Sequence, residues 1–160
     1  MSNANESQAQ VNFSWLRSNP YPGRGIVAGL DQTGNYAVQI YWIMGRSPNS
    51  RNRLFKSDEK TGRLYTEAAD AAAMTDPSLV IYNAMREADQ HYIVSNGDQT
   101  DTVAESRNAA HLSIALEKRI YEPDAPNFTQ RITAVSSLED SSHYIQMSIL
   151  RKSVFGEACD

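Results

Sequence analysis

Short apolar segments bounded by turn residues dominate the chain, a pattern typical of β-strands. Residues 26–30 and 36–44 flank the sequence Asp-Gln-Thr-Gly-Asn, in which Gly34 and Asn35 accept the positive φ of a hairpin turn. The pattern therefore predicts a β-hairpin over residues 26–44. Apolar side chains fall on both faces of the second strand, which predicts a central strand covered on both sides.

Further strands and one long helix are expected downstream. Strand-like segments occupy residues 79–86, 91–96, 131–137 and 143–152, the first two joined by residues 87–90 and the last two by residues 138–142. Residues 101–120 predict a helix that Pro123 and Pro126 end. Its partial apolar stripe consists of Val103, Arg107, Ala110, Ile114 and the pair Leu112–Leu116. A short helix is expected over residues 67–74.

The order of these segments predicts the fold class. Strand pairs, a helix and further strand pairs are typical of an α+β protein in which helices pack on antiparallel sheets. Residues 1–12 are polar, so we expect a flexible N-terminal tail there. We expect residues 13–160 to form a single domain.

Composition narrows the class of function. The chain has 160 residues, 41% of them hydrophobic, and a formal net charge of -4, which disfavours a broad nucleic-acid-binding surface. The aromatic residues lie mostly on expected strands, so an RNA-binding module is also disfavoured. A single cysteine, Cys159, excludes an intrachain disulfide. Without a signal pattern or a long apolar stretch, we expect a cytoplasmic protein with no membrane partner.

Positive charge is concentrated in one loop. Arg46, Arg51 and Arg53 lie within residues 45–53, directly after the expected hairpin, and no acid accompanies them. Arginine guanidinium groups together with Ser and Asn hydrogen-bond donors are suited to a small anionic ligand. Arg24 lies between two glycines at the start of another expected strand. The alternative is a solvated loop whose arginines keep an acidic protein soluble.

Two further polar segments are candidates for the same site. Residues 94–101 lie between a strand and the long helix, where Asp98 or Thr100 can cap the helix and free amides can face a polar ligand. Residues 121–131 form a proline-restrained loop with Glu122 and Asp124. The alternative for this loop is a plain connector between helix and strand.

In order along the chain, "GRGIVAG", "GRSPNSR", "YN", "VSNGDQTDT" and "YEPDAPNFTQRI" together resemble the archaeal-type inosine monophosphate (IMP) cyclohydrolase family. The family's second motif usually reads Arg-Ser-aromatic-Pro-Asn-Arg, whereas here the aromatic is absent and Ser50 is inserted. The resemblance implies a four-layer αββα sandwich similar to N-terminal-nucleophile hydrolases, without their nucleophile. Family members usually continue past the point where this chain ends, so the resemblance implies a domain truncated at the C-terminus.

The implied reaction is dehydrative closure of 5-formamidoimidazole-4-carboxamide ribonucleotide (FAICAR) to IMP in purine biosynthesis, by a hydrolase acting on cyclic amidines. It requires no cofactor and no metal. The resemblance implies Glu122 as proton shuttle, with Arg46 and Tyr82 orienting the reacting groups. The implied substrate-binding residues are Arg24, Ser47, Asn49, Arg51, Asn83, Asn96, Gly97, Thr100, Asp101, Asp124 and Arg131, with Arg24 and Arg51 on the phosphate. A non-catalytic purine-nucleotide-binding paralogue remains the alternative, and a homo-oligomer stays open.

Overall fold

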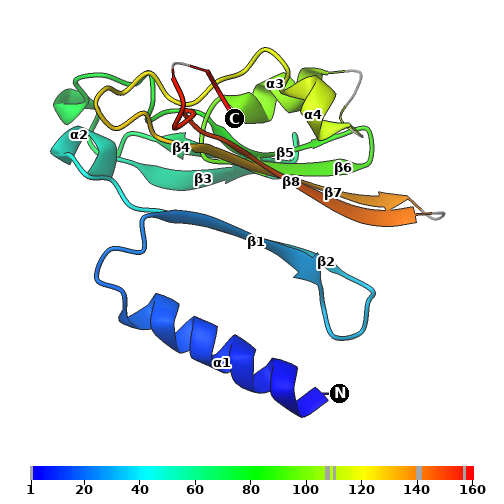
Figure 1. The fold of residues 1–160 in the computed structure, drawn as a ribbon. Helices are drawn as coiled ribbons and strands as arrows, with labels where there is room; N and C mark the ends of the chain where they lie inside the picture. The colour runs from blue at the N-terminus through cyan, green and yellow to red at the C-terminus, as the bar shows by residue number, and fades with distance from the viewer. Residues whose placement is uncertain (1, 107–108, 110, 140–141, 157) are drawn as a thin grey trace.

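Two antiparallel sheets form the framework of the protein (Figure 1). The computed structural model describes residues 2–106, 109, 111–139, 142–156 and 158–160. In the smaller sheet, β1 (Arg24–Leu30) pairs with β2 (Ala37–Ile43). The larger sheet has the order β3-β4-β5-β6-β7-β8, with the bounds Leu54–Asp58, Arg63–Glu67, Asn83–Ala88, His91–Ser95, Arg131–Glu139 and Ser142–Leu150. The α+β class is confirmed.

One long helix and several short ones lie around the two sheets. Their bounds are Ser2–Ser18 (α1), Pro48–Arg51 (α2), Gln99–Glu105 (α3) and Leu112–Ala115 (α4), with a 3₁₀ turn (η1) at Ala71–Ala73. Figure 1 shows α3 and α4 on one side of the six-stranded sheet, β1 and β2 on its other side, and α1 beyond the hairpin. Among the described helices, none is long and apolar enough to span a membrane.

The hydrophobic core lies between the six-stranded sheet and the helices α3 and α4. It consists of Ile93, Val103, Ala109, Leu112, Leu116 and Val135, all buried. Gln146 on β8 accepts a hydrogen bond from the Leu112 backbone N–H at 3.1 Å, which fixes the start of α4 against the sheet edge. This core anchors one face of the sheet and leaves the other face free for the hairpin.

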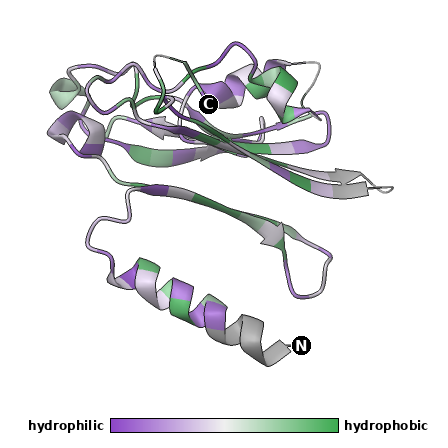
Figure 2. Cartoon of the chain, viewed as in Figure 1, coloured by the Kyte–Doolittle hydropathy of each residue, from purple (hydrophilic) through white to green (hydrophobic). Residues whose placement is uncertain are grey.

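The hairpin docks through polar side chains rather than through a second apolar core. Gln39 donates to the Tyr92 carbonyl at 2.9 Å and to Ser136 Oγ at 3.0 Å. The outward face of the hairpin is apolar and uncovered, because Ile40 and Val27 leave 52% and 49% of their surface exposed. Figure 2 shows this apolar run along β1 and β2. The predicted hairpin is confirmed, but the expectation that its second strand is covered on both faces is wrong.

The predicted long helix over residues 101–120 is wrong as a single element. Helix α3 ends at Glu105 because Ser106 adopts extended backbone angles, with φ −75° and ψ 137°. A straight helix of that length would extend roughly 30 Å in one direction. The break at Ser106 lets the chain change direction, so that α4 packs against β8. Of the predicted stripe, Arg107 and Ala110 lie outside the described residues.

Other expectations have mixed outcomes. The segment expected to be a flexible tail, residues 1–12, is helical from Ser2 onward, and α1 ends at Ser18 just before Asn19 and Pro20. Helix α1 contains no Gly or Pro, and the residue before a proline is disfavoured in a helix, which fits its end before Pro20.

The strands expected over 91–96, 131–137 and 143–152 are confirmed within two residues at their ends. The hairpin of β3 and β4, turning at Gly62 with φ +60°, was not predicted.

Candidate active site

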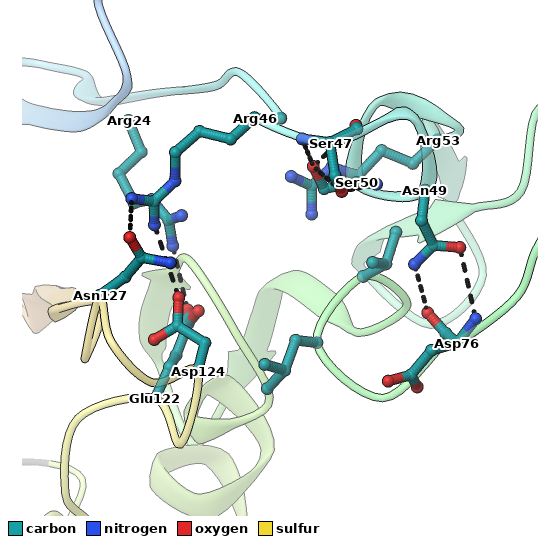
Figure 3. Close-up of a pocket in the computed structure, with 13 residues that line it drawn as sticks. Arg24, Arg46, Ser47, Asn49, Ser50, Arg53, Asp76, Glu122, Asp124 and Asn127 are labelled. Carbon is teal, nitrogen blue, oxygen red and sulfur yellow. Dashed lines mark hydrogen bonds and ion pairs between the residues drawn. The ribbon is translucent and has the colours of Figure 1, made fainter.

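A cavity of about 280 Å³ opens at one end of the hairpin, where β1 begins and β2 has just ended (Figure 3). Four segments far apart in sequence line it: the start of β1, the region from the β2–α2 loop to β3, the loop before β5, and the loop before β7. The lining residues are Arg24, Gly45, Arg46, Ser47, Asn49, Ser50, Arg53, Asp76, Leu79, Val80, Glu122, Asp124 and Asn127. A second cavity, of about 290 Å³, shares Arg24, Arg46 and Asn127 with the first.

The basic loop, residues 45–53, is fixed by hydrogen bonds within itself. Ser47 caps α2 by accepting from the Ser50 backbone N–H at 3.1 Å, and Ser50 Oγ accepts from the Ser47 N–H in return. Gly45 packs against the Ser50 backbone so closely that an added Cβ would lie 2.4 Å from its carbonyl group. Arg51 Nε donates to the Gly45 carbonyl at 2.9 Å, which closes the loop.

The acidic loop, residues 121–130, faces the basic loop across the cavity. Asp124 accepts hydrogen bonds from the backbone N–H and the hydroxyl of Thr129, and Glu122 donates its N–H to the Thr129 carbonyl at 2.8 Å. Arg46 reaches across to donate to Asn127 Oδ1 at 3.0 Å and to Thr129 Oγ1 at 2.6 Å. Figure 3 shows Arg24 and Arg46 extending toward this loop. The two loops therefore hold each other in place.

Glu122 is the most buried of the carboxyl groups that line the cavity. Its side chain is only 7% exposed, and Oε1 accepts from Arg24 Nη1 at 2.9 Å. Burial raises the pKa of Glu122 above its usual value, and the negative charge of Asp124 adds to this effect. The positive charges of Arg24 and Arg131 oppose the shift in pKa without cancelling it. A carboxyl group in this setting can exchange a proton nearer to neutral pH than an exposed one.

Tyr82 lies behind the cavity rather than in its lining. Its buried hydroxyl is 2.8 Å from the hydroxyl of Tyr41, so this pair joins the hairpin to the six-stranded sheet. Burial raises the pKa of both phenols, which keeps them neutral at physiological pH. Arg24, Arg53 and Glu122 line the cavity, and their charges also affect the pKa of the Tyr82 hydroxyl.

Six of the predicted site residues meet in this cavity: Arg24, Arg46, Ser47, Asn49, Glu122 and Asp124. The amide of Asn49 is occupied by the chain around Asp76, because it donates to the Asp76 carbonyl at 2.7 Å and accepts from the Thr75 N–H at 2.9 Å. Arg51 does not line this cavity. Asn49 and Arg51 therefore hold the basic loop in shape.

Asn83 and Asp101 form a separate cluster between β5 and α3. Asn83 Nδ2 donates to Asp101 Oδ1 at 2.8 Å, and Arg86 pairs with the same oxygen at 2.7 Å. Neither Asn83 nor Asp101 lines the cavity.

The remaining predicted residues build the corner between β6 and α3. Asn96 donates to the Gln130 carbonyl at 3.0 Å, and Thr100 donates to the Gly97 carbonyl at 3.2 Å. Arg131 pairs with Asp98 at 2.7 Å. Asn96, Gly97, Thr100 and Arg131 are buried and lie outside the cavity lining. Through the bond from Asn96 to the Gln130 carbonyl, this corner fixes the last residue of the acidic loop on the side away from the cavity.

Ser50, Asp76 and Asn127 also line the cavity, although the sequence assigned them no role in the site. Arg53 lines it too, and the sequence had singled it out as part of the basic loop suited to an anionic ligand. Arg53 and Ser50 belong to the basic run that the sequence singles out, and Asn127 to the proline-restrained loop, so a signal existed for these three. Asp76 carries no such signal. Within the described residues, no group of three or more His, Cys, Asp or Glu side chains could hold a metal ion.

Comparison with known proteins supplies the family. A search of curated proteins finds no match. The family profile of IMP cyclohydrolase-like proteins matches residues 21–156, a span that contains both sheets and every residue lining the cavity. Helix α1 precedes this span. The chain belongs to the IMP cyclohydrolase-like family.

Proposed function

We propose that the protein is an IMP cyclohydrolase, which closes FAICAR to IMP with loss of water as a step of purine biosynthesis. Membership of the family supports this reaction class. The single observation that carries the proposal is the buried carboxyl group of Glu122, held by Arg24 at the wall of a cavity with three arginines. The same proposal includes a cytoplasmic location and a nucleotide as the partner molecule.

The reaction needs a positioned acid more than it needs a strong nucleophile. The carboxamide nitrogen of the substrate attacks the formyl carbon of the same molecule, loses a proton, and the resulting hydroxyl group leaves as water once it is protonated. Glu122 can accept the first proton and return it, because burial raises its pKa toward the working range. One residue can thus serve both proton transfers.

Arg46 supplies positive charge where the formyl oxygen becomes negative. Its guanidinium group is fixed by Asn127, Thr129 and Asp124, so it needs no reorganisation during the reaction. Its side chain is 49% exposed, which leaves it accessible from the cavity. Tyr82 lies behind the cavity lining, so in this proposal its neutral phenol, hydrogen-bonded to Tyr41, supports the wall of the site rather than contacting the substrate.

The finer architecture belongs to the same proposal. The sequence of layers in Figure 1, with α3 and α4, the six-stranded sheet, the hairpin and then α1, is compatible with the four-layer αββα sandwich that the family resemblance implies.

A single-turnover experiment tests the function. Purified protein is mixed with FAICAR and the appearance of IMP is followed by absorbance, in parallel with Glu122→Gln and with the control Glu105→Gln. We expect the parent and Glu105→Gln to form IMP, because Glu105 pairs with Arg86 away from the cavity. Glu122→Gln should bind IMP but lose most of the turnover. If the parent binds IMP without forming it from FAICAR, the chain is a nucleotide-binding paralogue and the proposal fails.

A further inference from the structure

The edge strand β8 carries an apolar stripe, formed by Ile145, Met147 and Ile149, that its own chain leaves uncovered. These residues leave 37%, 59% and 57% of their surface exposed. They alternate along β8 with Gln146, which binds the start of α4, and Leu150, which packs on the core, so the stripe faces the hairpin side. The hairpin does not extend over it, because β1 lies on β7 and β2 lies on β6. In the described part of the chain, β8 therefore lacks the second layer that its neighbours have.

Both β8 and β1 have a free edge that nothing in their sequences protects. β8 is the last strand of the six-stranded sheet, and β1 pairs with β2 on one side only. Charged residues or Pro usually protect such edges against pairing with another chain. Residues 142–150 contain no Lys, Arg, Asp, Glu or Pro, and β1 contains only Arg24, at its first position. By contrast, β3 at the opposite edge of the larger sheet carries Lys56 and Asp58.

The two free edges run in opposite directions. Arg24 at the start of β1 and Ile132 near the start of β7 line the same cavity. Further along the hairpin, Gln39, which lies opposite Ala28, donates to Ser136 on β7. β1 therefore runs in the same direction as β7, and since β7 and β8 are antiparallel, β1 and β8 are antiparallel to each other. A two-fold axis parallel to the strands preserves strand direction, so β8 of a second copy can form an antiparallel ladder with β1.

The exposed surface of the chain is larger than that of a compact monomer. It amounts to 10542 Å², about 2,500 Å² more than the roughly 8,000 Å² expected for a monomer of 17.8 kDa. Helix α1 accounts for part of this excess, because most of its described residues are exposed. A stable interface needs only about 800 Å² from each partner. The excess therefore leaves enough surface for a stable dimer.

We infer that two copies of the chain associate about a two-fold axis parallel to the strands, so that β8 of each copy pairs with β1 of the other. Each six-stranded sheet is then extended by the hairpin of the second copy. The two β8 strands lie in opposite sheets, and their apolar stripes pack against each other as a shared core. Figure 1 shows α1 on the outer side of the hairpin and α3 and α4 on the outer side of the larger sheet, away from this contact. The dimer thus supplies the apolar layer that β8 lacks within one chain.

Sedimentation velocity over a series of protein concentrations tests this inference. The parent should sediment as a dimer, with twice the mass of the 17.8 kDa chain. Met147→Lys places a charge where the two stripes meet and should weaken the dimer about 10²–10³-fold, the usual effect of leaving a charge buried and unpaired. The control Ile114→Lys makes the same kind of change at a similarly exposed residue of α4 and should leave the dimer intact. Circular dichroism shows whether each variant is folded.

Cross-linking tests which face of β8 is in contact. In a Cys159→Ser background, which removes the single native cysteine, Met147→Cys should be joined to its counterpart in the second copy by a short bismaleimide. The two positions lie opposite each other across the axis. The control Ser148→Cys, on the helix side of β8, should not be joined.

A parent that stays monomeric throughout the series overturns the inference and leaves the β8 stripe to a different partner. A dimer that persists in Met147→Lys, or that is lost in Ile114→Lys, overturns it as well. If Met147→Lys does not fold, the cross-linking decides: a product from Met147→Cys and none from Ser148→Cys upholds the interface, and any other pattern overturns it. None of these measurements uses a nucleotide, so a failure of the dimer is distinguished from a failure of the proposed function.

Discussion

Ile93 on β6 is fully buried, whereas Ile40 on β2 leaves 52% of its surface exposed, although both residues lie on antiparallel strands. The six-stranded sheet packs on helices and carries the core. The two-stranded sheet attaches to it through Gln39, and to the loops beside it through Tyr41 and Arg24. The difference separates two tasks. One sheet carries the buried core, and the junction between the sheets carries charged groups that line the cavity.

The largest effect should come from the buried sheet. Ile93→Ala removes a side chain from the core and should lower the free energy of unfolding by about 2–5 kcal/mol. Ile40→Thr, a β-branched change on the exposed face, should stay within about 0.5 kcal/mol of the parent. Urea unfolding of both variants gives the measurement. Equal losses would mean that the hairpin face is covered in solution and that the contrast between the sheets does not hold.

The next effect concerns turnover rather than stability. Arg46→Ala should reduce the rate of IMP formation by about 10²–10³, the usual result of removing a donor to a developing oxyanion. Its partly exposed contacts with the acidic loop should contribute no more than about 1 kcal/mol to unfolding. The rate of IMP formation per folded molecule is measured for Arg46→Ala and Ile93→Ala at a temperature where both variants are folded. This comparison separates an effect on turnover from an effect on stability. A variant that turns over normally would reduce Arg46 to a loop-holding residue.

A smaller effect should appear at the junction itself. Tyr41→Phe removes one hydroxyl and leaves that of Tyr82 without its 2.8 Å partner. The loss in the free energy of unfolding should be about 1 kcal/mol, and up to roughly 3 kcal/mol if the Tyr82 hydroxyl stays buried and unsatisfied. Thermal unfolding by circular dichroism measures it. No change in the melting temperature would show that this pair does not join the sheets energetically.

The smallest effect should be a pH dependence of stability due to Glu122. Its pKa in the folded protein is raised above the ordinary value of 4.5, so the folded state holds more protons than the unfolded state between the two values. Stability from this group is therefore present at low pH and is lost as the pH rises through that window. Urea midpoints of the parent should fall relative to Glu122→Gln over this range. A rise instead would mean that Arg24 outweighs burial.

Local patterns predicted the strands whose residues alternate or whose turns carry Gly and Asn, such as the hairpin around Gly34. They failed where tertiary packing decides: β2 looks buried on both faces in sequence, but little of the described chain covers its outer face. The helical spacing over residues 101–120 also gave no sign of the break at Ser106.

The candidate site shows the same limit. Charge and spacing identified Arg46, Glu122 and Arg24 as site candidates, and these do meet in one cavity. Asn96 and Thr100 have equally polar side chains, yet these side chains donate hydrogen bonds to the carbonyl groups of Gln130 and Gly97. Sequence alone cannot distinguish a polar residue that faces a cavity from one whose partners are already supplied, because that depends on contacts between distant segments.

The position of the cavity between two sheets has a consequence for how the proposed activity would be lost on heating. Among its four lining segments are the start of the hairpin and the acidic loop, and in the described part of the chain these two are joined by side-chain contacts such as the Arg24–Glu122 pair. Segments held by few buried apolar contacts open in sub-global fluctuations at lower free energy than the core. Detachment of the hairpin would dismantle the cavity while the six-stranded sheet stays folded, so inactivation is expected to precede the cooperative melting of the core.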